Sequence, residues 1–165
     1  MTPPEIRTLF AYNRWANRRL LVAASLISRD DFSRDMHASF GSVRGTLIHL
    51  LWGEGRWLQF WKDGSLIPDA DPDEYPNVAA LETAWEQIEE AQHAFAADLT
   101  DERLASTMKV KENQYTLAEL VQHILNHSTY HRGQVALLLR QIGHRPPSTD
   151  FRLFLTEARD IGLEI

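Results

Sequence analysis

The chain has 165 residues, of which 44 % are hydrophobic and 24 % charged, and its formal net charge is −6. This balance is ordinary for a soluble globular protein, and the length is most simply that of one domain over residues 1–165. The acidic charge and the lack of a long basic run argue against nucleic-acid binding. No cysteine is present, which excludes a disulfide framework, a thiolate metal site and a cysteine nucleophile.

Features of an exported or membrane-spanning protein are also missing from the sequence. Residues 1–10 hold no apolar signal core, and no run approaches the roughly 18 apolar residues of a membrane span. Together with the lack of cysteine, this predicts a cytoplasmic protein without membrane contact.

The first predicted helix begins near the start of the chain. Proline is tolerated in a first helical turn, so the helix is expected to begin at Pro3, with Thr2 as its cap. Asn13 and Asn17 fall on its apolar face, where buried asparagines usually satisfy a neighbouring backbone group. The polar residues 28–35 predict a loop after this helix.

The second predicted helix runs to residue 61 behind the cap Ser42. His49 lies on the flank of its apolar face, beside small residues that allow another helix or a ligand to come close. Glu54 lies well inside that face, where a carboxylate needs a positive partner or a metal. A salt bridge to an arginine of the first helix, a metal ligand, and a hydrogen-bonding or proton-accepting group near the metal are all open roles for Glu54.

A loop rich in proline and aspartate follows over residues 63–76, and its length suits a crossover between non-adjacent bundle positions. Asn77 then caps a third predicted helix. Its acidic residues, expected on a solvated face, are Glu82, Glu86, Glu89 and Glu90. Loose alternation between residues 104 and 115 predicts a short extended pair, with residues 36–40 as a candidate partner.

The fourth predicted helix covers residues 116–143. Thr116 and Glu119 form a capping box at its start, and Gly143 stands just past its end. A short terminal helix is predicted over residues 151–159. Four amphipathic helices and one long connection predict an all-α fold, a four-helix bundle with a crossover and a short C-terminal helix.

Two histidines, His127 and His131, lie one turn apart in the middle of the apolar stripe of the fourth helix. Unpaired polar groups in a core cost about 1–3 kcal/mol, so these imidazoles need partners. Side chains at i and i+4 point the same way and can share one metal ion, while hydrogen bonds to neighbours are the alternative. His123 lies at the edge of the stripe, two turns from His131, and is not expected to be a ligand.

A mononuclear site needs a third ligand, and His49 of the second helix is geometrically the best candidate. Three neutral imidazoles leave a coordination position for water or substrate, as in reactive metal sites. Such an ion could lower the pKa of bound water or thiol, or polarise a carbonyl. A ferritin-like carboxylate site is rejected, because the chain has one Glu-x-x-His unit, Glu90 with His93, where two are needed.

Four segments resemble the DinB family, the DinB/YfiT-like metalloenzymes: YNRWAN at 12–17, LIHLLWGEGRWL at 47–58, NHSTYHRGQVALLLRQIG at 126–143 and PPSTDF at 146–151. The resemblance implies a bundle with an unusual crossover and a divalent metal ion, most often nickel or zinc. On this sequence, the family's ligand positions fall on His49, His127 and His131. Neither His123 nor Glu54 is implied as a ligand.

The resemblance also implies a class of reaction. Members of the wider superfamily use the metal to activate a low-molecular-weight thiol, and family members are frequently homodimers. This chain is therefore expected to be a homodimeric, metal-dependent transferase or hydrolase with a small-molecule substrate. The alternative is a non-catalytic bundle that holds a metal or small ligand, with a role in stress.

Overall fold

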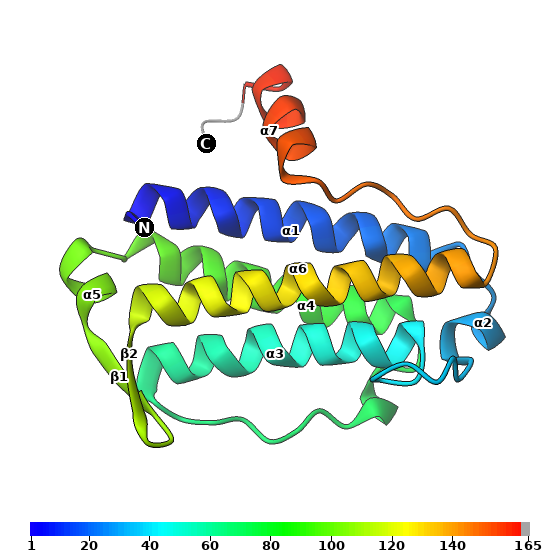
Figure 1. Cartoon of the computed structure of the whole chain (residues 1–165), viewed down its shortest axis with the longest axis horizontal. Helices are drawn as coiled ribbons and strands as arrows, with labels where there is room; N and C mark the ends of the chain where they lie inside the picture. The colour runs from blue at the N-terminus through cyan, green and yellow to red at the C-terminus, as the bar shows by residue number, and fades with distance from the viewer. Residues whose placement is uncertain (163–165) are drawn as a thin grey trace.

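A computed structural model describes residues 1–162. Four long helices lie side by side (Figure 1): α1 (Pro3–Ser25), α3 (Val43–Asp63), α4 (Val78–Ala97) and α6 (Leu117–Gln141). Helices α1 and α3 each pack against both α4 and α6, so the four surround a common core. The all-α fold predicted from the sequence is confirmed. None of the helices within residues 1–162 is long and apolar enough to cross a membrane.

The helices begin at the capping residues that the sequence predicted. Thr2 and Thr116 each form a capping box with a glutamate three positions on, and the side chains of Ser42 and Asn77 cap α3 and α4. Each cap accepts a hydrogen bond from a backbone N–H that the helix itself leaves unpaired. Gly143 follows α6 with a φ of 85°, a conformation that favours glycine.

The long connection between α3 and α4 is a crossover that runs the length of the bundle. Both helices point the same way (Figure 1) and pack against each other, so the chain has to return about 30 Å before α4 begins. A single 3-10 turn, η1 (Pro72–Glu74), interrupts the connection. The prediction that the crossover joins non-adjacent positions is wrong. Its length reflects the parallel direction of two neighbouring helices.

Short elements occupy the connections between the long helices. Helix α2 (Arg29–Ser33) replaces the loop expected over residues 28–35, because Ser28 caps it and Phe32 is buried in the core. Helix α5 (Asp101–Ala105) leads into a hairpin of β1 (Thr107–Val110) and β2 (Asn113–Thr116), which confirms the extended pair. Residues 36–40 are not part of this hairpin. Helix α7 (Phe151–Asp160) packs on α1.

A buried carboxylate joins the four long helices at the centre of the bundle. Glu54 of α3 is 1 % exposed, and its Oε1 accepts three hydrogen bonds of 2.9 to 3.0 Å. Two longer contacts of 3.4 Å reach Oε2. The donors are Asn13 and Asn17 of α1, Trp85 and Gln92 of α4, and Ser128 of α6.

The positive counterpart of Glu54 is Arg132 of α6, which is also 1 % exposed. Arg132 Nη1 donates to the side-chain oxygens of Asn13 and Asn17, at 3.0 Å for Asn17. Each asparagine thus accepts from the guanidinium and donates to the carboxylate of Glu54. Of the roles left open for Glu54, the salt bridge to an arginine of the first helix is not formed, because two amides from that helix separate Glu54 from an arginine of α6.

Glu89 of α4 corrects the expectation of a wholly solvated acidic face. Its side chain is buried and lies 3.0 Å from Arg14 and 3.1 Å from Arg18 of α1. Burial raises the pKa of Glu89, although the two nearby guanidinium groups act to lower it. Desolvation of the carboxylate, together with the negative charge of Glu54, therefore outweighs the attraction of two half-exposed arginines.

Glu89→Gln is expected to leave the free energy of unfolding at pH 7 unchanged or higher, because a neutral amide avoids the cost of burying the charge. The raised pKa means that the protonated form of Glu89 favours folding. That contribution is present below the ordinary value of 4.5 and is lost as the pH rises through the raised pKa. Denaturant unfolding from pH 4 to pH 8 should therefore show a smaller loss of stability in the variant than in the parent.

The exposed Glu86 on the same helix provides the matched control, since Glu86→Gln should change neither the stability nor its pH dependence. A loss of about 3 kcal/mol on Glu89→Gln at pH 7 would contradict the prediction, because that is the cost of breaking a favourable buried ion pair.

Candidate metal centre

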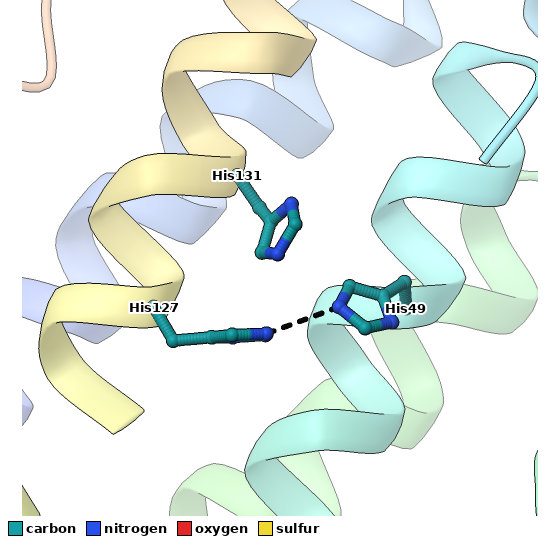
Figure 2. Close-up of side chains that lie close together, drawn as sticks. All are labelled: His49, His127 and His131. Atoms are coloured by element: carbon teal, nitrogen blue, oxygen red, sulfur yellow. Dashed lines mark hydrogen bonds between the residues drawn. The ribbon is translucent and has the colours of Figure 1, made fainter. Parts of the chain in front are cut away.

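Three histidines from two neighbouring helices lie together, His49 on α3 and His127 and His131 on α6 (Figure 2). Their candidate ligand atoms all lie within 4.8 Å of one another. The Nε2 atoms of His49 and His127 are 3.0 Å apart. Two zinc–nitrogen bonds at a tetrahedral angle would separate such atoms by about 3.3 Å, so the spacing is close to that of two ligands on one ion.

The orientation of His131 is set by a neighbour on its own helix. His131 Nδ1 lies 2.7 Å from Gln134 Oε1, one turn further along α6. With this oxygen as acceptor, Nδ1 carries the proton and Nε2 keeps its lone pair for a metal ion. Metal-binding histidines commonly donate their second ring nitrogen in this way.

Burial keeps the other two histidines neutral. Desolvation and, to a smaller extent, the charge of neighbouring histidines lower the pKa of His49 and of His127 to about 4. The neutral imidazole is the form that binds metal ions. Both side chains are therefore in the form needed for ligation throughout the physiological pH range.

His127 is packed closely against α3 because of a glycine. A Cβ added at Gly53 would lie 3.4 Å from His127 Cε1, so the ring rests against the backbone of the facing helix. His127 Nδ1 is buried and, among residues 1–162, has no hydrogen-bond partner. An unpaired buried nitrogen is costly, so this ring is held at the site at the expense of one hydrogen bond.

Phe40, from the segment before α3, covers one side of the histidine group. Its ring stacks on His49 with centroids 3.8 Å apart and meets the edge of His131 at 5.4 Å. Gly45 makes this position possible, because a Cβ there would lie 2.0 Å from the carbonyl oxygen of Phe40. The apolar ring limits access of water to the imidazoles on that side.

The other two candidates from the sequence lie outside the group. His123 is exposed and packs edge-on against Trp57, with ring centroids 5.3 Å apart. Glu54 is directed into the asparagine network and is not part of the histidine group. Both placements agree with the expectation that neither residue is a ligand.

Two residues near the site, Gln134 and Phe40, were not identified from the sequence. The spacing of His131 and Gln134, three apart on one helix, is a signal that could have identified the glutamine. Phe40 carries no such signal, since it belongs to an irregular segment whose position depends on the packing of the whole bundle.

We predict that the double variant His127→Ala/His131→Ala loses the divalent ion, because a single remaining imidazole cannot hold it. Elemental analysis of protein purified like the parent measures the result. His123→Ala is the matched control from the same helix and should keep most of its metal. Unchanged metal content in the double variant, or an equal loss of metal in His123→Ala, would show that the three histidines are not the ligands.

Gln134→Ala should weaken metal binding roughly 10- to 100-fold, since the proton of His131 Nδ1 loses its acceptor and the ring its orientation. Competition with a chromophoric chelator measures the affinity, and circular dichroism checks that the variant is folded. Gln141→Ala, an exposed position near the end of the same helix, should bind like the parent. Equal affinities for the two variants would show that Gln134 does not orient the site.

Comparisons with known proteins agree with the fold and with the family suggested by the sequence. The model of the DinB family matches residues 1–162. Protein DinB of Bacillus subtilis (strain 168) is 27 % identical over 165 aligned residues, covering 89 % of this chain and 91 % of that protein. The crystal structure of a DinB-like protein from Bacillus subtilis shares the fold, with a TM-score of 0.68 and 20 % identity over 88 % of this chain and 97 % of the other. Since the family model matches nearly every residue, this chain belongs to the DinB family.

Proposed function

We propose that this protein is a metal-dependent enzyme of the S-transferase type, in which His49, His127 and His131 hold one nickel or zinc ion. The observation that carries the proposal is the convergence of three imidazoles from two helices within 4.8 Å. Structural zinc sites have four protein ligands, whereas catalytic ones have three and an open position. Within residues 1–162, the group contains no fourth histidine or acidic side chain.

A bound ion would supply a Lewis acid that lowers the pKa of a coordinated thiol or water. The three histidines suit this role because they are neutral and leave the charge of the ion uncompensated. Gln134 holds His131 in one tautomer, and Phe40 shields His49 from solvent on one side. The chain thus orients the ligands and lowers the local polarity, which strengthens electrostatic effects at the site.

A thiol is favoured over water as the activated group. Hydrolysis by a metal-bound water usually needs a nearby base, and Glu54, the carboxylate that the sequence offered for that role, already accepts from five donors. A coordinating thiol, by contrast, loses its proton without a protein base. The chain has no cysteine, so the thiol would come from a co-substrate of low molecular weight.

Cobalt(II) substitution tests the proposal directly. Titration of the cobalt protein with 2-mercaptoethanol should produce a thiolate-to-cobalt absorption band and shift the visible spectrum, because the open position accepts the sulfur. His123→Ala should respond like the parent, and His49→Ala should lose the response. A parent spectrum that is insensitive to thiol, with no exchangeable water on the ion, would instead support a non-catalytic bundle that holds a metal.

A further inference from the structure

We propose that the cavity between α3 and the crossover is the substrate pocket of the histidine centre, and that it takes the planar apolar body of a small molecule. This inference rests on the proposed function, because it needs an ion at His49. The cavity has a volume of about 580 Å³, within the range of small-molecule sites. His49 is the member of the histidine group that lines it, so the cavity adjoins the metal centre at this imidazole.

Two aromatic rings that line the cavity lie close to the imidazole of His49. Phe40 stacks on His49, and the ring of Trp52 lies 6.4 Å from it, one turn further along α3. Ile48 adds aliphatic surface on α3, and Ala70 and Pro72 add it from the crossover. Ring faces and aliphatic groups bind a flat apolar ligand through stacking and burial of its surface.

The charged groups at the cavity are engaged in holding the crossover. Arg44 donates to the carbonyl oxygens of Pro72 and of Tyr75, at 2.8 Å for Tyr75. Asp69 lies 3.5 Å from the guanidinium of Arg56. Arg44 keeps its positive charge, but two of its nitrogens are held by carbonyl oxygens of the crossover, and rings and aliphatic groups make up most of the cavity lining. The surface offered to the body of a ligand is therefore mainly apolar.

Trp52 is both a wall of the cavity and an anchor of the crossover. Its Nε1 donates to the carbonyl oxygen of Pro68 at 2.7 Å, and Arg56 lies over its ring at 4.6 Å. Replacing Trp52 therefore has two separable effects. Trp52→Phe removes the hydrogen bond and keeps a ring, whereas Trp52→Ala removes both.

Two nitrogen ligands with the same donor test the pocket on the cobalt(II) protein. Imidazole reports the open position alone, and 4-phenylimidazole adds a planar apolar ring. The parent should bind 4-phenylimidazole about tenfold more tightly than imidazole, as expected for burying a phenyl group. This tenfold difference in affinity should nearly vanish in Trp52→Ala and largely persist in Trp52→Phe. Imidazole-4-acetate, with a charged body, should show no gain.

Trp57→Ala is the matched control, because Trp57 lies on the same helix outside the cavity and should leave the tenfold gain intact. The assignment of the cavity as the substrate pocket would be wrong if the parent bound imidazole and 4-phenylimidazole with equal affinity. It would also be wrong if Trp52→Ala kept the higher affinity for 4-phenylimidazole. Tighter binding of imidazole-4-acetate than of 4-phenylimidazole would contradict the proposal that the cavity takes an apolar ligand body. No spectral response to imidazole itself would show that the ion has no open position, and the proposed function would then fall together with the pocket.

Discussion

The hydrogen-bonded link between Glu54 and Arg132 is the constraint on which the arrangement of the four helices depends. A buried carboxylate or guanidinium costs several kcal/mol unless its partners are in place. Here the network, with Glu54 on α3 and its partners on α1, α4 and α6, includes all four long helices, and its members meet only when each helix has one rotation and one axial position. A core of leucines alone would tolerate neighbouring positions more readily, since apolar contacts have little directionality.

The same constraint determines the direction in which the histidine side chains point. Ser128 and Arg132, which belong to the network, directly follow His127 and His131 in the sequence. Neighbouring residues on a helix differ by about 100° in direction, so the rotation that brings the first pair to the network turns the second pair toward α3. Glu54 likewise follows Gly53, whose bare backbone receives the ring of His127. Satisfying the buried charges and assembling the imidazoles are therefore consequences of one packing arrangement.

Local signals explain what could be predicted from the sequence. Capping residues gave the starts of the long helices, and the four-residue spacing of His127 and His131 placed two imidazoles on one face. Features that depend on which faces meet were not predictable in this way. The burial of Glu89 is one example, because nothing in α4 alone shows that this face meets α1. Ligation of an ion by the histidines and self-association of the chain stay predictions.

The parallel direction of α3 and α4 has a consequence for how the protein can diversify. The crossover that this direction requires contributes no residue to the Glu54 network or to the histidine group, yet it forms one wall of the cavity beside His49. The entropy cost of a loop grows only slowly with its length, by about 0.6 kcal/mol for each doubling. Insertions and substitutions in this one connection can therefore reshape the cavity while the bundle and its ligands stay as they are, so that selection for new ligands and selection for stability act on different residues.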